Sequence, residues 1–386
     1  AQLRSGMKRM QRSLVLEQNL NSLKDDKETN QIIRTVKELF MKNVNNSKQL
    51  SVLIDKYLIP QEKEKKKNAE ISTPYQLRQE MLNTIPKEFW TQKKTVFEPC
   101  SGKGGFIVDI IDRFMEGLKN KYPDEKERYK IIVEECLYFA DINPTNIFIC
   151  KLLVDPYNEY KLNYYEGNTL ELDIKEQWSL EGFHAVIGNP PYQAPRKKNN
   201  GHTIWQFFTY NSLEKWLINL GYLLFIHPAG WRKPNSYFID NKKLSDIMKK
   251  NNFMMYLEIH NTKDGIKKFN CGTRYDWYLI HKRKNNSSTH IVDELGQKYK
   301  LNLQNLCCIP NYNIENYINL FDTKTNDIIY KRCYEHSSTK KNVKRFKDDI
   351  YKYPLIHSAN KSGVRYLYTN NNNKGYFGLK KVIFGD

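Results

Sequence analysis

The sequence predicts an α/β protein whose core is a parallel, doubly wound sheet. Between residues 71 and 285, short apolar runs bounded by turn residues alternate with longer helix-like segments, and this alternation is typical of such sheets. Sheets of this kind bind ligands at the carboxyl ends of their strands. The strand candidates are residues 96–97, 137–140, 185–187, 222–226, 254–259 and 277–281, and helices are predicted at 106–118 and 144–153.

Because 386 residues exceed one small domain, we expect two domains, or one large domain with helical and C-terminal additions. Residues 1–70 are polar, with apolar positions at helical spacing from Ile32 to Phe40 and a charged linker at 61–67. They predict a helical N-terminal extension to an α/β domain at 71–285. Residues 286–386 carry a basic segment and end on an apolar run that resembles a beginning strand. We therefore expect that the natural chain continues, or that this C-terminal region is incomplete.

The composition favours a polyanionic partner. Lysine and arginine outnumber acids by 62 to 43, giving a formal charge of +19, and 26 tyrosines offer faces for base stacking. A coding bias toward lysine explains the charge equally well. The sequence has no apolar run of the ~18 residues that a membrane span needs, and its first residues lack the apolar core of a signal peptide. A soluble intracellular protein is expected.

The cysteines and histidines predict no structural metal. The seven cysteines include no C-x-x-C pair, and the eight histidines show no H-x-x-x-H pattern. An odd count of cysteines, several of them in apolar runs, favours reduced thiols over disulfides.

A glycine-rich turn follows the first strand candidate, at residues 97–106. Glycines at 102, 104 and 105 allow a sharp turn and a close approach to a ligand. The turn lacks the order of a phosphate loop, because Lys103 stands between glycines. Glu98 beside it favours a cationic ligand over a phosphate. An ordinary loop of the same composition is the alternative.

Polar residues follow two further strands. Asp141 ends the second strand candidate, where an acid accepts hydrogen bonds from ribose hydroxyls in nucleoside-binding folds. A helix cap followed by Pro144 in the first turn is the alternative, and both roles can coexist. Asn168 ends a third predicted strand and could face an adenine edge, although by itself it indicates only a turn.

The tetrapeptide Asn189-Pro190-Pro191-Tyr192 directly follows a buried strand candidate. Two prolines fix the backbone and remove two N–H donors. The amide oxygen of Asn189 and the carbonyl of Pro190 can then each accept a hydrogen bond from a planar amino group. This would turn the nitrogen toward a tetrahedral geometry and free its lone pair. Tyr192 would stack on a base extruded from a duplex. A plain Pro-Pro turn is the alternative.

In this order the motifs resemble those of the gamma-class N6-adenine DNA methyltransferases of restriction-modification type. Residues 72–81 are similar to the family's TPxxL…M segment, and the similarity extends over residues 71–285. It implies a Rossmann-like fold that binds S-adenosylmethionine, with catalysis by Asn189, Pro190 and Tyr192. It also implies a set of cofactor-binding residues, which are Thr73, Glu98, Pro99, Cys100, Gly102, Gly104, Phe106, Asp141, Ile142, Asn168, Thr169 and Asn189. Asn168 departs from the family's usual Asp.

The resemblance further implies contacts with double-stranded DNA, and a separate restriction or recognition subunit is a further expected partner. Residues 286–386 would form the target-recognition region. Trp231 would lie near the flipped base, with core packing as the alternative. The expected DNA-binding residues are Arg196, Lys197, Lys198, Trp231, Lys340, Lys341, Lys344 and Arg345.

Other functions share the tetrapeptide. Methyltransferases of release-factor glutamine or of RNA guanine carry it too, and a non-catalytic nucleic-acid-binding or structural protein could retain the fold. Residues 72–81, the basic C-terminal region and the overall charge favour DNA. Pro123-Asp124 lacks a following E-x-K on a strand, so no endonuclease site is predicted and a cleavage partner would be another chain or a further region.

Overall fold

The computed structural model describes residues 34–35, 38, 46–58, 71–194, 203–233, 236–284, 287–321, 343–360 and 363–372. The chain divides into two compact units, Ala1–Asp322 and Thr323–Asp386. Among the residues just given, no helix is both long enough and apolar enough to cross a membrane.

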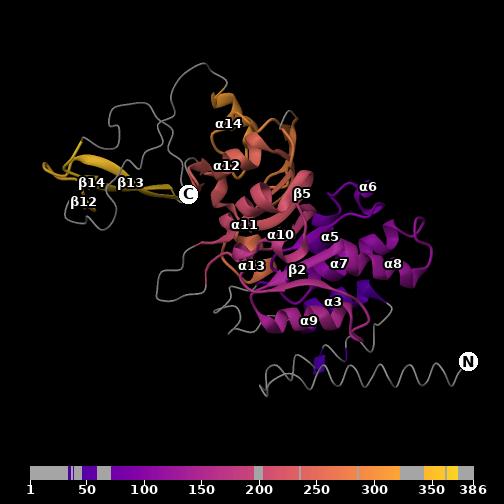
Figure 1. Ribbon diagram of the computed structural model, residues 1–386. Helices are drawn as coiled ribbons and strands as arrows, with labels where there is room; N and C mark the ends of the chain where they lie inside the picture. The colour runs from indigo at the N-terminus through magenta and orange to yellow at the C-terminus, as the bar shows by residue number, and fades with distance from the viewer. Residues whose placement is uncertain are drawn as a thin grey trace, which may run out of the picture. The chain divides into compact units, whose positions relative to one another are not determined.

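A large mixed sheet forms the centre of the first unit (Figure 1). Nine of the described strands form it, in the order β11-β10-β8-β9-β5-β4-β1-β2-β3. Their bounds are β1 Val96–Glu98, β2 Leu137–Asp141, β3 Asn163–Glu166, β4 Phe183–Gly188, β5 Leu217–Pro228, β8 Phe253–His260, β9 Tyr275–His281, β10 Thr289–Val292 and β11 Lys298–Leu301. The short pair β6 Phe238–Ile239 and β7 Lys242–Lys243 forms a separate ribbon.

The strand order reverses at β1. From β1 the chain adds β2 and β3 on one side, then β4 and β5 on the other, all parallel to one another. At such a switch point the loops after neighbouring strands diverge and leave a crevice at their carboxyl ends. The ends of β1, β2 and β4 carry Glu98, Asp141 and Gly188, the last directly before Asn189.

The part of the sheet beyond β5 departs from the expected parallel arrangement. β9 lies between β5 and β8 and runs antiparallel to both. Since β8 is thereby parallel to β5, β9 fills the gap between two parallel strands and satisfies the backbone groups of both. Tyr275 through Ile280 are all buried, and residues 277–280 form the apolar run by which this strand was predicted.

All six predicted strands lie in the sheet, and the two predicted helices correspond to α7 Gly105–Gly117 and α9 Pro144–Val154. β10 and β11 were not predicted, and β3 was expected only as a strand before Asn168, without bounds. β10 pairs with β8, buries Ile291 in the core and holds Thr289 Oγ1 2.7 Å from the Met254 carbonyl oxygen. The boundary expected at residue 285 therefore falls inside the first unit, because the sheet continues past it.

Helices cover both faces of this sheet (Figure 1). One face packs on the segment from α5 to α9 and on Phe269 of α13, and the other packs on α10, α11, α12 and α14. The remaining helices are α3 Ser47–Tyr57, α5 Tyr75–Leu82, α6 Lys87–Trp90, α8 Glu125–Ile131, α10 Ile174–Trp178, α11 Trp205–Asn211, α12 Leu244–Asp246, α13 Thr262–Phe269 and α14 Ile314–Phe321. The π-helical turns Ile132–Cys136, Ser212–Trp216 and Ile247–Asn251 lead into β2, β5 and β8.

The helix α3 belongs to the region expected as an N-terminal extension. Leu50, Ile54 and Leu58 pack against Val108 of α7 and the apolar side of α9. The helix therefore covers α7 and α9 as a further layer of the first unit. The apolar positions from Ile32 to Phe40 that predicted a helix lie outside the described residues.

The second unit contains a three-stranded antiparallel sheet in the order β12-β14-β13. Its strands are β12 Val343–Lys344, β13 Tyr353–Asn360 and β14 Gly363–Thr369. Lys344 and Arg345 are exposed, and the Lys344 ammonium lies 4.4 Å from the centre of the Tyr351 ring. The final apolar run of the sequence lies outside the described residues.

Six cysteines fall within the described residues, and all six are free thiols. Cys333 lies outside them. The described part of the chain contains no group of three or more side chains arranged to hold a metal ion.

A buried histidine stabilises the core beneath the carboxyl end of β5. The His227 ring stacks on Trp205 at 4.0 Å between ring centres, and its Nε2 lies 2.7 Å from the Tyr278 hydroxyl. Burial lowers the pKa of His227 from its ordinary value to about 3. The neutral ring is thus the form that the folded core accepts.

The pKa of His227 predicts a loss of stability in acid. Because the folded pKa lies below the unfolded value of about 6.5, the unfolded chain binds the extra proton and stability falls as pH drops from about 6.5 toward 3. The contribution is on the order of 4 kcal/mol over this range, about 2 kcal/mol of it by pH 5. Urea unfolding of the His227→Gln variant at pH 7 and pH 5 measures it.

The matched control is His290→Gln, which changes an exposed histidine on β10. The difference in unfolding free energy between the two pH values should shrink in His227→Gln and stay unchanged in His290→Gln. Equal pH dependence in all three proteins would show that His227 carries no such linkage.

Candidate cofactor and catalytic site

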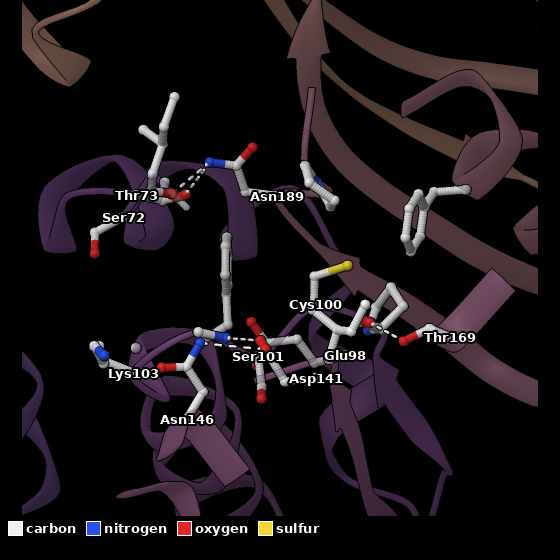
Figure 2. A pocket seen from close by; sticks show the side chains of 18 of the residues that line it. Ser72, Thr73, Glu98, Cys100, Ser101, Lys103, Asp141, Asn146, Thr169 and Asn189 are labelled. Atoms are coloured by element: carbon white, nitrogen blue, oxygen red, sulfur yellow. Dashed lines mark hydrogen bonds between the residues drawn. The ribbon is translucent and has the colours of Figure 1, made fainter. Parts of the chain in front are cut away.

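A pocket lies at the carboxyl ends of β1, β2 and β4 (Figure 2). Its walls come from the glycine-rich turn, the loops after β2, β3 and β4, the segment before α5, and α3 and α11. Eleven of the twelve residues predicted to bind the cofactor line it, namely Thr73, Glu98, Pro99, Cys100, Gly102, Phe106, Asp141, Ile142, Asn168, Thr169 and Asn189.

The glycine-rich turn is held by Asp141 rather than by its own backbone alone. The Gly102 N–H donates to Asp141 Oδ2 at 2.9 Å, and the Ser101 N–H donates to the Ala140 carbonyl. Gly104 adopts φ +84° and is the N-cap residue of α7. A side chain there would meet Cys150 and Leu153 within 3.4 Å, so Gly104 allows close packing of α7 on α9 and does not line the pocket.

Glu98 brings a desolvated carboxylate into the pocket. It ends β1 with 2% of its surface exposed, and its Oε2 has no hydrogen-bond partner among the described residues. Burial raises the pKa of Glu98 well above its ordinary value, while the nearby Arg78 acts in the opposite direction. A buried acceptor without a partner is costly, and a cationic ligand such as an ammonium group would relieve this cost.

Asp141 serves both as a structural acceptor and as a wall of the pocket. It accepts from the N–H groups of Gly102 and Asn143 and from Nδ2 of Asn146. Burial raises its pKa, against these hydrogen bonds. Asn143, rather than Asp141, caps α9 through its own side chain. Ile142 beside it is 52% exposed, an apolar surface next to a carboxylate, as a nucleoside ligand would require.

The loop after β3 is joined to the glycine-rich turn. Thr169 Oγ1 donates to the Pro99 carbonyl at 2.8 Å. The Asn168 amide is already engaged in its own turn, accepting from the Leu170 N–H and donating to Glu171 Oε1. Asn168 lines the pocket, and its adenine contact stays a prediction.

The nitrogen of the Asn189 amide is hydrogen-bonded, whereas its oxygen has no partner among the described residues. Its Nδ2 donates to the Ile71 carbonyl at 3.1 Å and to Thr73 Oγ1 at 3.2 Å. Figure 2 shows the nitrogen turned toward Thr73 and the oxygen turned away from it. Oδ1 is buried and has no partner among the described residues. The amide therefore presents an acceptor in need of a donor.

The rest of the tetrapeptide follows this turn. Pro190 is buried and Pro191 lines the pocket. Tyr192 is not among the residues that line the pocket, and its hydroxyl is buried and unpartnered among the described residues. Burial is the main cause that raises the pKa of Tyr192, and neighbouring Cys271 and Tyr275 raise it further. The hydroxyl therefore stays protonated and neutral.

Several pocket residues were not predicted as site residues. Ser101, Lys103 and Gly105 belong to the glycine-rich turn, and Arg78 belongs to the 72–81 segment, so the motifs already pointed to them. Asp55 could not be found this way, because it lies in α3, far from any motif. The other unpredicted lining residues are Ile54, Ile71, Ser72, Asn146, Pro191, Ile204 and Phe208.

The predicted DNA contacts have mixed outcomes. Trp231 is fully buried and its indole N–H donates to Asp276 at 2.9 Å. It is therefore a core residue, as the alternative interpretation held, and the prediction of a base contact is wrong because no surface of the ring is accessible. The remaining candidates on the first loop and in the basic segment, Arg196, Lys197, Lys198, Lys340 and Lys341, lie outside the described residues.

The two ends of the loop that carries Arg196, Lys197 and Lys198 lie within the described residues. Gln193 pairs with Thr203 across an antiparallel bridge, and the Ile204 N–H donates to the Tyr192 carbonyl at 3.2 Å. Both ends of the loop are therefore fixed directly after the Asn189–Tyr192 turn.

The fold and this site define a Rossmann-like methyltransferase. Residues 135–264, about a third of the chain, match the profile of the family described as Eco57I restriction-modification methylase. The match includes the second strand, the acid at its end and the N-P-P-Y tetrapeptide. It confirms the resemblance predicted from the sequence. The protein is a DNA methyltransferase of restriction-modification type, with S-adenosylmethionine as its cofactor.

Solved structures with a similar chain course include three bacterial proteins. A modification subunit of a putative type I restriction enzyme from Vibrio vulnificus is 15% identical, with a TM-score of 0.48, covering 92% of this chain and 75% of the other. A putative class I S-adenosylmethionine-dependent methyltransferase from Listeria monocytogenes is 13% identical, with a TM-score of 0.44 and coverage of 72% and 89%.

A type I restriction-modification methyltransferase subunit from Streptococcus thermophilus is 12% identical, with a TM-score of 0.45 and coverage of 73% and 59%. No curated protein matches the chain.

The space around Gly105 in the pocket wall is too small for a larger side chain. A Cβ at this position would lie 2.7 Å from the guanidinium of the buried Arg78. Gly105→Ala should therefore destabilise the fold by roughly 1–2 kcal/mol, since overpacking outweighs the better helix propensity of alanine. It should also weaken S-adenosylmethionine binding, because Arg78 borders the pocket. Denaturant unfolding and calorimetric titration measure the two effects.

Gly272→Ala is the matched control, since its nearest neighbour would be 3.9 Å from the added Cβ. The control should keep the stability and the cofactor affinity of the parent protein. If Gly105→Ala behaves in the same way, the guanidinium can move aside and the limit does not exist.

Proposed function

We propose that the protein transfers a methyl group from S-adenosylmethionine to the exocyclic N6 of an adenine in double-stranded DNA, a base that it extrudes from the duplex. The observation that carries the proposal is the buried, unpartnered Oδ1 of Asn189 at the mouth of the cofactor pocket. An amino N–H is the kind of group that such an acceptor requires.

The pocket has the chemical features that S-adenosylmethionine requires. Glu98 supplies an unpartnered acceptor for an ammonium group. Asp141 supplies a carboxylate edge for ribose hydroxyls, and the exposed face of Ile142 suits the adenine ring. Thr73, Pro99, Cys100, Gly102, Phe106, Asn168 and Thr169 would complete the walls. When bound, the cofactor supplies a methyl group activated by its sulfonium charge.

The acceptor amino group would be oriented by the Asn189-Pro190 pair. Its nitrogen is conjugated with the ring and is a poor nucleophile. One N–H would donate to Asn189 Oδ1 and the other to the Pro190 carbonyl, so that the lone pair leaves the ring plane. No general base is needed for the attack, since the proton can leave afterwards. Tyr192 would stack on the extruded base.

The choice of adenine and of DNA rests on the sequence context. The tetrapeptide by itself serves any planar amino group. Residues 72–81, whose Thr73 hydroxyl accepts a hydrogen bond from Asn189 Nδ2, and the charge of +19 favour adenine in DNA. The loop with Arg196, Lys197 and Lys198 begins directly after Tyr192, where a duplex flanking an extruded base would pass.

We also propose a division of labour along the chain. Residues 71–285 would carry the chemistry, with α3 of the N-terminal region packed on them. Residues from 286 onward would contribute to target recognition, with Lys340, Lys341, Lys344 and Arg345 as phosphate contacts. A separate restriction or recognition subunit would complete the system.

Asn189→Ala predicts a loss of methyl transfer without a loss of folding. The variant should lower turnover by roughly 10²-fold or more, because it removes an acceptor aligned with the reacting amino group. S-adenosylmethionine should still bind. The assay follows labelled methyl groups into DNA and identifies the product as N6-methyladenine, with RNA and a release-factor peptide offered in parallel.

Asn163→Ala is the control, since that amide lies at the amino end of β3, away from the pocket. It should keep full turnover. Full activity of Asn189→Ala would overturn the mechanism, and label in RNA or peptide alone would assign the fold to a different acceptor. Cofactor binding without label in any acceptor would favour a non-catalytic protein.

DNA binding should weaken steeply with salt. If six to ten phosphates are contacted, affinity should fall by roughly 10³-fold or more between 50 and 200 mM salt, because bound counterions are released. Fluorescence anisotropy with a labelled duplex measures the slope. Neutralising Arg196, Lys197 or Lys198 should each lower the slope by about one. A complex insensitive to salt would mean that the positive charge is incidental.

A further inference from the structure

The orientation of the Asn189 amide is fixed by two groups from a different part of the chain. Nδ2 lies 3.1 Å from the Ile71 carbonyl oxygen and 3.2 Å from Thr73 Oγ1. A carbonyl can only accept a hydrogen bond, so the nitrogen must face Ile71. Turning the amide over would place two oxygens against each other and would direct the N–H groups toward the substrate. The contacts with Ile71 and Thr73 therefore orient the amide so that its acceptor oxygen, Asn189 Oδ1, faces the pocket.

The segment 71–73 is in turn held by a buried arginine. Arg78 donates from Nη1 to the Thr73 carbonyl and, at 2.6 Å, to Asp55 Oδ1, while its Nε lies 2.6 Å from Asp109 Oδ2. Arg78 and Asp109 are each 2% exposed. Asp55 also accepts from the Tyr75 N–H with its other oxygen. One guanidinium therefore joins α3, α5 and α7 at the point where the chain enters the pocket.

We propose that the ion-pair cluster of Asp55, Arg78 and Asp109, together with Thr73, positions the catalytic amide of Asn189. The helix α3, which carries Asp55, thereby contributes to methyl transfer. Arg78 fixes the Thr73 backbone, and Thr73 in turn fixes the orientation of the Asn189 amide. Asp55 holds the Arg78 guanidinium, so the position of α3 affects the orientation of the amide. This inference rests on the proposed function of Asn189 and assigns its positioning residues.

The charges of the cluster explain why it can hold one geometry. Breaking a buried ion pair by removing one partner leaves an uncompensated charge in a medium of low polarity, which is strongly unfavourable. The planar guanidinium also offers its donors at fixed angles, so the two carboxylates and the Thr73 carbonyl must lie at set positions around it. Gly105 leaves the space that the guanidinium occupies.

The first test compares Thr73→Val with Thr73→Ser. Valine matches the shape of threonine but cannot accept from Asn189 Nδ2, whereas serine retains the hydroxyl. In Thr73→Val we expect the single-turnover rate of methyl transfer to fall roughly 3- to 30-fold, while the dissociation constant for S-adenosylhomocysteine stays within about twofold. Thr73→Ser should restore most of the rate.

A second readout needs neither cofactor nor DNA. In protein labelled with 15N at asparagine, the Asn189 side-chain amide is assigned by its absence in Asn189→Ala. Its hydrogens should exchange slowly in the parent protein, because both contacts shield them, and faster in Thr73→Val. A Thr73→Val variant that binds the cofactor analogue much more weakly and keeps the parent exchange rate would make Thr73 a cofactor contact only, and would overturn the proposal.

The role of α3 is tested with Asp55→Asn. Asparagine keeps an oxygen for the Tyr75 N–H but removes the charge that pairs with Arg78. We expect a roughly 10-fold slower single turnover and faster exchange of the Asn189 amide hydrogens. The control is Gln79→Ala, which breaks the 2.7 Å contact of Arg113 with Gln79 between the same helices α5 and α7, outside the pocket.

Gln79→Ala should leave both readouts unchanged. If Asp55→Asn and Gln79→Ala slow the reaction equally, the cluster contributes only general stability and the inference is wrong. If Thr73→Val and Asp55→Asn turn over at the parent rate, it is wrong as well. Failure of the proposed function is a different result, since the parent protein itself would then methylate no adenine.

Discussion

The reversal of strand order at β1 is the constraint on which the site depends. Because β2 and β4 flank β1 and run parallel to it, the residues that follow all three strands meet at one edge of the sheet. Glu98, Asp141 and Asn189 are separated by 43 and 48 positions in the chain, as their numbers show. They nevertheless line one pocket. The remaining elements, including α3, close the space that this reversal opens.

The site combines polar groups that water no longer reaches. Burial raises the pKa of both Glu98 and Asp141, and the Asn189 oxygen lacks a partner among the described residues. Burying such groups without a partner costs free energy. A ligand with an ammonium group and ribose hydroxyls would offset this cost at Glu98 and Asp141. A second molecule with an amino group would offset it at Asn189.

Much of the fold followed from local patterns. The strands β1, β2, β4, β5, β8 and β9 were predictable because buried strands leave continuous apolar runs bounded by turn residues. β10 and β11 were not, because their exposed or alternating residues resemble loop, and β3 was expected only from the turn at Asn168 that follows it. The antiparallel direction of β9 could not be predicted either, because the local sequence of a strand does not indicate the direction of its neighbours. Trp231 belongs to the core because Asp276, 45 positions away, accepts its N–H.

The sequence by itself determined the chemistry, since the N-P-P-Y tetrapeptide, the glycine-rich turn and the acid after β2 each depend on residue types at fixed short spacings. Only the tertiary structure decided how the Asn189 amide is turned and what holds it. Those contacts come from Ile71 and Thr73, more than a hundred positions earlier, and through Arg78 from Asp55. Hydrogen bonds and ion pairs between distant segments exist only once the chain has folded, so no local pattern in the sequence could have revealed them.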